Sequence, residues 1–150
     1  MRVGSRGGVY AAPERAGRNG WGPRMTDLAL SLAPVADSIP LARHTLSRLS
    51  ERLDGRQLDD LRLLVSEVVS NSVRHGEGTG PIQLRVTVEP ATVRVEVEDP
   101  GPGFQPSPEL EPPGRHDGWG LLLVDRLSAR WGFVAGASTV VWFEIDRLSA

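Results

Sequence analysis

Two neighbouring segments of the chain alternate hydrophobic and polar residues with a period of two. The hydrophobic positions are Ile82, Leu84, Val86 and Val88 in the first segment and Val93, Val95 and Val97 in the second. This pattern predicts two β-strands that each bury one face, and Glu89-Pro90-Ala91 between them predicts a hairpin turn. Shorter patterns of the same kind predict an edge strand over residues 28–33 and further strands over 131–136 and 139–146.

Three other segments have the spacing of helices. Ser38 is suited to cap a helix that leucines at helical intervals carry to about residue 53. A second helix is predicted over residues 56–75, with Gly76 as its C-cap. After a long loop, residues 120–131 predict a third helix.

Segments without such patterns divide the chain. Residues 1–26 show no periodicity and predict a disordered N-terminal arm, in which Met25 is a candidate for the true start of the protein. Residues 100–118 are too rich in proline and glycine for regular structure, and residues 147–150 are expected to be a short tail. The order of elements predicts one α+β domain over residues 27–146. We expect a two-layer α/β sandwich in which helices cover one face of a mixed, mostly antiparallel sheet.

Polar residues interrupt the apolar side of the second predicted helix. Glu67, Asn71 and His75 stand four residues apart, so successive side chains are offset by only about 40° around the helix axis. Asn71 and His75 fall within about 20° of Leu64, which belongs to the apolar stripe. Unpaired burial of such groups costs on the order of 1–3 kcal/mol, so they either cap local backbone beside the core or serve a ligand. A glutamate can accept the proton of a hydroxyl, and an amide oxygen suits Mg²⁺.

Asp99 is a further polar residue on a predicted core face. It continues the parity of the valines in its strand and therefore points toward the core where the chain leaves the sheet. Gly101 and Gly103 follow, and their missing side chains allow a ligand to approach the backbone. Two interpretations stay open: Asp99 opens an ordinary Asp-Pro-Gly turn, or its carboxylate accepts a hydrogen bond from an adenine amine.

Two weaker signals come from the C-terminal part of the chain. Gly118 and Gly120 stand where the third helix is expected to begin, and the free amides and positive end of a helix bind phosphate well. A G-x-G sequence is also common in a plain turn from loop to helix. Thr139 shares the parity of Val141 and Phe143, which places one hydroxyl on an apolar strand face, although most threonines of this kind are structural.

Composition excludes several classes of protein. All 17 basic residues are arginine, and the lack of lysine excludes a G-x-x-x-x-G-K-[ST] phosphate loop, lysine Schiff-base chemistry and the usual eukaryotic-type kinase site. A dinucleotide loop of the G-x-G-x-x-G type after a first strand is also missing. The net charge of −2 offers no basic field for nucleic acid, and no apolar run reaches the roughly 18 residues of a membrane helix. We expect a cytoplasmic protein without direct contact to nucleic acid or membrane.

The polar and glycine positions follow a characteristic order along the chain. They form Glu67-x-x-x-Asn71-x-x-x-His75, then Asp99-x-Gly101-x-Gly103, then Gly118-x-Gly120, then Thr139. This order resembles the ATP-binding domain shared by DNA gyrase, heat-shock chaperones, histidine kinases and mismatch-repair ATPases, known as the GHKL or Bergerat fold. The segments SEVVSNSVRHG, DPGPGF and GWGLLLVDRLSARWG are most similar to the bacterial anti-sigma-factor serine kinase branch of this superfamily. The resemblance covers residues 27–146.

The resemblance implies that the cofactors are ATP and Mg²⁺, and it implies a role for each matching residue. Glu67 would be the general base or position a water molecule, Asn71 would bind Mg²⁺, and His75 would support the site. Asp99 would bind the adenine amine, assisted by Thr139. Gly101 and Gly103 would let the base approach, Gly118 and Gly120 would hold phosphates, and residues 104–117 would form a lid. Members of the family often have arginine where this chain has Trp119, so Arg115 is the candidate for a cation that faces the phosphates.

The same resemblance implies a function. A member of the anti-sigma branch would transfer phosphate from Mg-ATP to a serine or threonine of an anti-sigma antagonist protein and bind a sigma factor as its other partner. The resemblance also suggests a homodimer. The gyrase and mismatch-repair branches need a second domain, for which we expect no room here. A histidine kinase needs a phosphoacceptor helix, whereas His44 lies on a predicted helix of the domain itself. The alternative, to which Trp119 gives weight, is an ATP-binding regulatory module of the same fold without kinase activity.

Overall fold

Five strands form one antiparallel sheet in the computed structural model, which describes residues 2–3, 9–10, 26–75, 80–100 and 116–147. The strands are β3 (Leu28–Leu32), β4 (Ile82–Val88), β5 (Thr92–Asp99), β6 (Arg130–Ala135) and β7 (Thr139–Asp146). Their spatial order is β3-β4-β5-β7-β6, and each neighbouring pair in this order is antiparallel. The predicted strands and the edge position of β3 are confirmed. The sheet is antiparallel throughout its described strands, not mixed as we expected.

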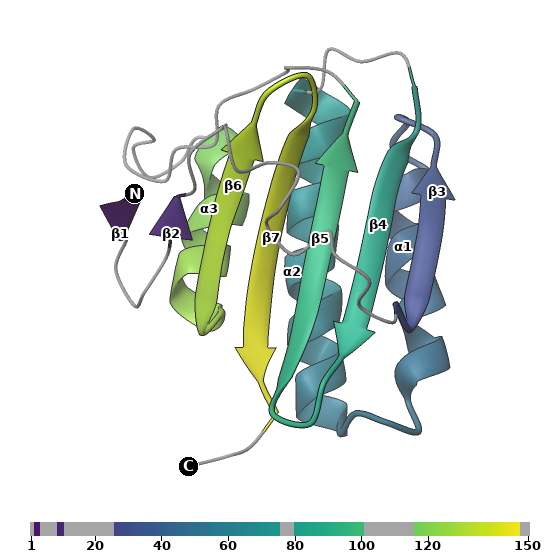
Figure 1. Cartoon of the computed structure of the whole chain (residues 1–150). Coiled ribbons are helices and arrows are strands. Elements are labelled where there is room, and N and C mark those ends of the chain that lie inside the picture. Colours follow the sequence, from purple (N-terminus) through teal and green to yellow (C-terminus); the bar gives the residue numbers. More distant parts are fainter. Residues whose placement is uncertain (1, 4–8, 11–25, 76–79, 101–115, 148–150) are drawn as a thin grey trace.

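The helices cover one face of this sheet (Figure 1). They are α1 (Ser38–Thr45), the 3₁₀ helix η3 (Leu46–Leu49), α2 (Gly55–His75) and α3 (His116–Leu127). Leu61 and Leu64 of α2 are fully buried in the same hydrophobic cluster as Val95 of β5 and Phe143 of β7. The predicted two-layer α+β sandwich is therefore confirmed. Within the described ranges, no helix has the length and apolar character needed to cross a bilayer.

The first helix differs from its prediction in its second half. We expected one α-helix to about residue 53, but α1 ends at Thr45 and the chain continues as the 3₁₀ helix η3. The Thr45 hydroxyl donates a hydrogen bond to the carbonyl of Leu41 (2.7 Å). Side chains three residues apart eclipse in a 3₁₀ helix, so both Leu46 and Leu49 face the core, and both are buried.

The third helix was predicted about four residues too late. Residues 120–131 were expected to be helical, but α3 runs from His116 to Leu127 and Trp131 belongs to β6. Trp131 pairs with Phe143 of β7 and is almost fully buried, and its indole Nε1 donates a hydrogen bond to Asp125 (2.9 Å). Burial of this large ring in the sheet outweighs the helical spacing of the sequence around it.

A pair of two-residue strands lies in the N-terminal segment that was expected to be disordered. β1 (Arg2–Val3) pairs with β2 (Val9–Tyr10), and β2 lies beside β6 (Figure 1). Such short strands have no detectable periodicity in the sequence. The rest of this segment up to residue 25, including Met25, and residues 148–150 lie outside the described residues.

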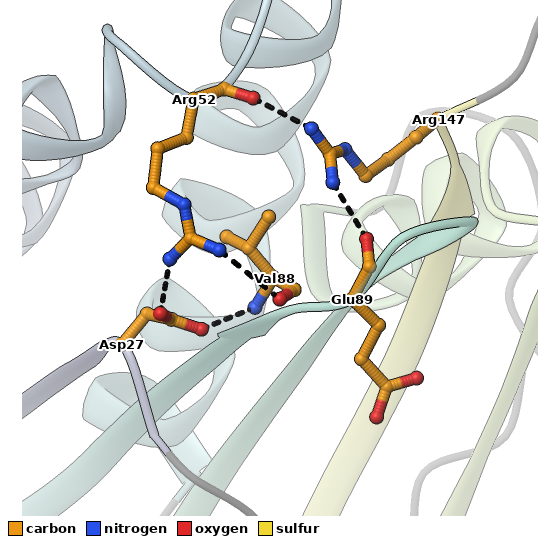
Figure 2. Close-up of polar contacts among 5 residues, drawn as sticks. All are labelled: Asp27, Arg52, Val88, Glu89 and Arg147. Carbon is orange, nitrogen blue, oxygen red and sulfur yellow. Dashed lines mark hydrogen bonds and ion pairs between the residues drawn. The ribbon is translucent and has the colours of Figure 1, made fainter.

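Polar contacts close the end of the sandwich where β4 turns into β5 (Figure 2). Asp27 forms an ion pair with Arg52, and its Oδ2 accepts a hydrogen bond from the backbone N–H of Val88 (2.6 Å). Arg147 donates hydrogen bonds to the carbonyls of Glu89 (2.7 Å) and Arg52 (2.8 Å). We call Asp27, Arg52 and Arg147 the basal clamp, because they join β3, the β4–β5 hairpin, the end of β7 and the segment before α2.

A reciprocal cap fixes the start of α2 at this same end. Asp54 Oδ1 accepts a hydrogen bond from the backbone N–H of Gln57 (2.8 Å), and Gln57 Oε1 accepts one from the backbone N–H of Asp54 (3.0 Å). This capping box satisfies two N–H groups at the helix start. Gln57 Nε2 also donates to the carbonyl of Arg147 (2.7 Å). The beginning of α2 is thus held at the basal clamp, and its last turns lie at the opposite end of the sandwich.

Candidate functional site

Several elements converge at the end of the sandwich that lies away from the basal clamp. β4 pairs with β5 so that Gln83 lies opposite Glu98, which places the start of β4 beside the end of β5. Only residues 76–81 connect the end of α2 to the start of β4. The last turns of α2 therefore lie at the same end of the molecule as the end of β5, as Figure 1 shows. Asp99 is the last residue of that strand. The start of β7 is also there, because β5 and β7 are antiparallel neighbours.

Asp99 and Thr139 occupy directly paired positions on β5 and β7. Both residues are buried, with 2% and 1% of their surface exposed. Paired residues on antiparallel strands point to the same face, with Cβ atoms about 4.5–5.5 Å apart. The expected placement of Asp99 on the core face is confirmed. The structure also places Thr139 beside it, which suits the two residues to bind one ligand together.

Asn71 brings a buried amide to the last turns of α2. The residue is 2% exposed, and its Oδ1 has no hydrogen-bond partner among the residues that the structure describes. A buried oxygen without a partner costs about 1–3 kcal/mol. The alternative in which this oxygen caps a nearby backbone N–H finds no such bond in the described part of the chain. Oδ1 is therefore available to a ligand that donates a hydrogen bond or to a cation that accepts its lone pair.

Glu67 lies one helical turn before Asn71 and is only partly buried. It lines an open groove of about 510 Å³, to which α1, α2 and α3 all contribute side chains. The buried Asn71 and the open groove thus lie on adjacent sides of Glu67 on the helix. This position suits a carboxylate that serves both a bound ligand and a molecule arriving from solvent.

The groove contains residues that the sequence analysis missed. Ser66, Ser70 and Arg74 repeat the four-residue spacing of Glu67, Asn71 and His75, shifted by one position. Ser70 Oγ accepts a hydrogen bond from the Arg74 guanidinium (2.9 Å). This second line of polar residues could have indicated the groove from the sequence, although serine and arginine on a helix usually indicate only a face exposed to solvent.

The glycines expected to bind phosphate lie within α3 instead of ahead of it. Because the helix begins at His116, Gly118 is its third residue and Gly120 its fifth. Only the first four N–H groups of a helix lack an intrahelical partner. Gly118 therefore belongs to the set that is free to bind an anion, and Gly120 does not. Several further predictions lie outside the described part of the chain. They concern Gly101, Gly103, Arg115, the side chain of His75 and lid residues 104–115.

A metal site built from protein side chains alone is not found in the described part of the chain. No group of three or more His, Cys, Asp or Glu residues there could hold an ion. Magnesium in nucleotide sites needs only one or two protein ligands, since phosphates and water supply the rest. The buried Oδ1 of Asn71 is a hard oxygen ligand of this kind, so the residues present fit an Mg²⁺ ion that arrives with a nucleotide.

A group of paired charges among the described residues lies on the other face of the sheet. Arg94 is buried there between Glu96 and Glu144, each 3.7 Å away, and its guanidinium stacks on Trp142 at 4.4 Å from the ring centre. The hydrogen bond that Arg130 donates to Glu144 (2.8 Å) is the main cause of a raised pKa for this arginine. Arg94 and Glu96 alternate with the helix-facing valines of β5, and Glu144 and Trp142 are their partners on β7, so this group stands apart from the candidate site.

Residues 32–144 match the family of histidine kinase-like ATPase domains. The match covers most of the chain and agrees with its five-stranded α+β sandwich, so the protein belongs to this family of the GHKL superfamily. The similarity extends to the serine-protein kinase RsbW of Listeria monocytogenes, which is 28% identical over 116 residues. The aligned part covers 67% of this chain and 74% of the Listeria protein. The resemblance identified from the sequence is confirmed at the level of the family.

Proposed function

We propose that the chain is a Mg-ATP-dependent serine/threonine protein kinase of the anti-sigma-factor type. Its acceptor would be a hydroxyl of an anti-sigma antagonist protein, and its other partner a sigma factor. The observation that carries the proposal is the buried pair of Asp99 and Thr139. It lies at the end of the sandwich where the amide oxygen of Asn71 has no hydrogen-bond partner among the described residues. Membership in the ATPase family and similarity to a serine-protein kinase support it.

Asp99 would select the base of the nucleotide. Its carboxylate can accept a hydrogen bond from the exocyclic amine of adenine, with the Thr139 hydroxyl beside it. Burial strengthens this bond, because no water competes for the carboxylate. Guanine carries a carbonyl oxygen at the corresponding position, which the carboxylate would repel. The pair therefore favours ATP over GTP.

Asn71 would hold Mg²⁺ through Oδ1, the atom that has no partner among the described residues. When bound, the ion would neutralise charge on the phosphates of ATP. The backbone N–H of Gly118, in the first turn of α3, would contribute a hydrogen-bond donor to the same phosphates.

Glu67 would act as the general base for the transfer. Its carboxylate accepts the proton of the acceptor hydroxyl while that oxygen forms a bond to the γ-phosphorus. The bond from the γ-phosphorus to the β–γ bridging oxygen breaks, and ADP leaves with its electron pair. The position of Glu67 at the edge of an open groove allows a protein hydroxyl to reach it.

Substitution of Glu67 tests this assignment. With labelled ATP and candidate antagonist proteins, Glu67→Gln is expected to lower transfer by roughly 10²–10⁴-fold, the usual contribution of a general base, and to leave ATP affinity within about twofold. Glu51→Gln, at an exposed glutamate outside the groove, is the matched control and is expected to keep the wild-type rate. Full activity of Glu67→Gln would refute the role of Glu67.

Absence of transfer to every candidate, despite tight ATP binding, would favour the alternative of an ATP-binding regulatory module without kinase activity.

We further propose that residues 27–146 form the nucleotide-binding unit and that the protein works in the cytoplasm. We also propose that two copies pair into a homodimer, which sedimentation would test.

A further inference from the structure

The two residues that would bind adenine stand at the ends of their strands. Asp99 is the last residue of β5 and Thr139 the first residue of β7, and they form the terminal pair in the ladder between these strands. Pro100 follows directly and has no N–H with which to continue the ladder. Because the ends of secondary structure elements open more easily than their centres, the separation of this pair benefits from a contact outside the ladder.

A hydrogen bond on the opposite face of the sheet is such a contact. Ser138 Oγ donates to Glu98 Oε2 over 2.8 Å, and the bond is partly buried. Glu98 directly precedes Asp99 in β5, so its side chain points to the face away from the helices. Ser138 directly precedes Thr139. We call Glu98 and Ser138 the back clip, because they join the end of β5 to the start of β7 behind the adenine pair.

Both members of the back clip have backbones that are fixed by other contacts. The carbonyl of Ser138 accepts a hydrogen bond from the backbone N–H of Gly136 (2.9 Å), which closes the turn between β6 and β7. Glu98 lies opposite Gln83 of β4 on one side and Val140 of β7 on the other. The back clip therefore connects a central strand of the sheet to the turn that precedes Thr139.

The back clip also has the chemistry of a strong contact. A hydroxyl that donates to a carboxylate forms a charge-assisted hydrogen bond, which is about twice as strong as one between neutral groups. A site whose side chains already hold the binding geometry has less to order when its ligand arrives, and this raises affinity. Loss of the contact would therefore weaken the bonds that depend on the separation of Asp99 and Thr139.

We propose that Glu98 and Ser138 are positioning residues of the adenine site, which hold Asp99 and Thr139 at the separation that the base requires. Neither side chain would touch the nucleotide, since the bond between them lies on the other face of the sheet. The inference rests on the proposed function, because it needs Asp99 to accept a hydrogen bond from the adenine amine.

A comparison of ATP with purine riboside triphosphate tests this role, because the analogue differs from ATP only in lacking the exocyclic amine. Calorimetric titration of the full chain in the presence of Mg²⁺ gives the ratio of the two affinities, which reports the bond to Asp99. Ser138→Ala is expected to lower the affinity for ATP about fivefold and to leave that for the analogue within about twofold, as weakening of one hydrogen bond allows. Glu98→Ala is expected to have the same effect.

Conservative variants and a control on the same face locate the effect. Glu98→Gln keeps a side-chain oxygen that can accept the hydroxyl, and Ser138→Thr keeps the donor, so both are expected to retain the wild-type ratio. Ser31→Ala is the matched control. Ser31 accepts a hydrogen bond from Gln83 (3.3 Å) on the same face, but it belongs to the edge strand β3 and does not contact the adenine pair. This variant is also expected to keep the ratio.

An unchanged ratio in Ser138→Ala would overturn the proposal. An equal loss of affinity for both nucleotides would overturn it too, because that is the effect of a residue that only stabilises the fold. If the wild type prefers ATP over the analogue and Ser138→Ala keeps that preference, the back clip is refuted and the adenine site is not. If the wild type binds both nucleotides equally, or binds neither, the proposed function of Asp99 itself is contradicted.

Discussion

Asn71 places one polar atom where the surrounding helix buries hydrophobic side chains. Leu64, Val65 and Val68 on the same helix are almost fully buried, and Asn71 is nearly as inaccessible. Its Oδ1 has no hydrogen-bond partner among the described residues, so a hydrophobic residue of similar size would suit the nucleotide-free protein better. The amide is explained if a bound ligand supplies the missing partner.

Asn71→Leu is expected to affect the stability of the nucleotide-free protein and its binding of Mg-ATP in different ways. Removal of the unpaired oxygen should raise the free energy of unfolding of the nucleotide-free protein by about 1 kcal/mol, or leave it unchanged if the leucine packs less well. The same substitution should abolish the dependence of ATP affinity on Mg²⁺. Urea unfolding without nucleotide and calorimetric titration with and without Mg²⁺ measure the two effects. A loss of more than about 2 kcal/mol would show that Asn71 is a structural residue.

The sequence predicted which side chains of the site are buried better than it predicted which residues they contact. Parity alone placed Asp99 on the core face, and the offset around the helix placed Asn71 beside the apolar stripe. The local pattern did not show that Asp99 and Thr139 are paired, because β5 and β7 are not consecutive strands, and only the family resemblance had assigned the two residues to one ligand. The register between such strands depends on the whole sheet and not on local pattern.

At the scale of elements, α2 joins the two ends of the sandwich. Its first turn is held by the Asp54–Gln57 cap and by the bond from Gln57 to Arg147. Its last turns carry Asn71 and one side of the groove. Anchoring at the basal clamp fixes the helix against the sheet, and so fixes the position of Asn71 relative to Asp99.

The basal clamp is expected to contribute to stability without affecting the site. Asp27→Ala removes the acceptor for the Val88 N–H and the partner of Arg52, so we expect a loss of about 1–2 kcal/mol in the free energy of unfolding. Arg52→Ala should cost less, about 0.5 kcal/mol after screening by solvent, because the Arg52 side chain is 48% exposed. Urea unfolding measures both losses. Equal losses would show that the ion pair, and not the hydrogen bond to the Val88 N–H, supplies most of this stability. Neither variant is expected to change the affinity for ATP.

Element boundaries were predicted well where one period dominated. The spacing of α2 is helical over its whole length, and β4 and β5 alternate cleanly, so these elements came out nearly as expected. The end of α3 was missed because Trp131 fits the helical spacing of the sequence, yet its burial in β6 is decided by pairing with distant Phe143. The 3₁₀ turn of η3 also has no separate signal, since its leucines suit either kind of helix.

At the scale of the whole molecule, the two ends of the sandwich differ in the polar groups that they carry. The basal end has the ion pair between Asp27 and Arg52, a helix cap and a tight hairpin. The opposite end gathers buried Asp99, Thr139 and Asn71 beside an open groove. The Asn71 oxygen, which has no hydrogen-bond partner among the described residues, adds nothing to the stability of the free protein and becomes favourable when a ligand pairs with it.

Nucleotide binding should therefore stabilise the fold as a whole. At a free ATP concentration of about 100 times its Kd, with Mg²⁺ present, binding adds about 2.7 kcal/mol to the free energy of unfolding. For a domain of this size we expect the Tm to rise by about 5–10 °C, as measured by circular dichroism. GTP at the same concentration should raise the Tm less, because its base presents a carbonyl to Asp99. Equal shifts would refute selection of adenine by this residue.

The proposed adenine site depends most directly on the carboxylate of Asp99. Isothermal titration of the wild type and of Asp99→Asn with ATP in the presence of Mg²⁺ tests it, with near-ultraviolet circular dichroism to verify that both proteins keep the same fold. We expect the wild type to bind and Asp99→Asn to bind at least about tenfold more weakly, because a neutral amide replaces a buried charged acceptor. Equal affinities in two correctly folded proteins would contradict the assignment of Asp99 to the adenine base.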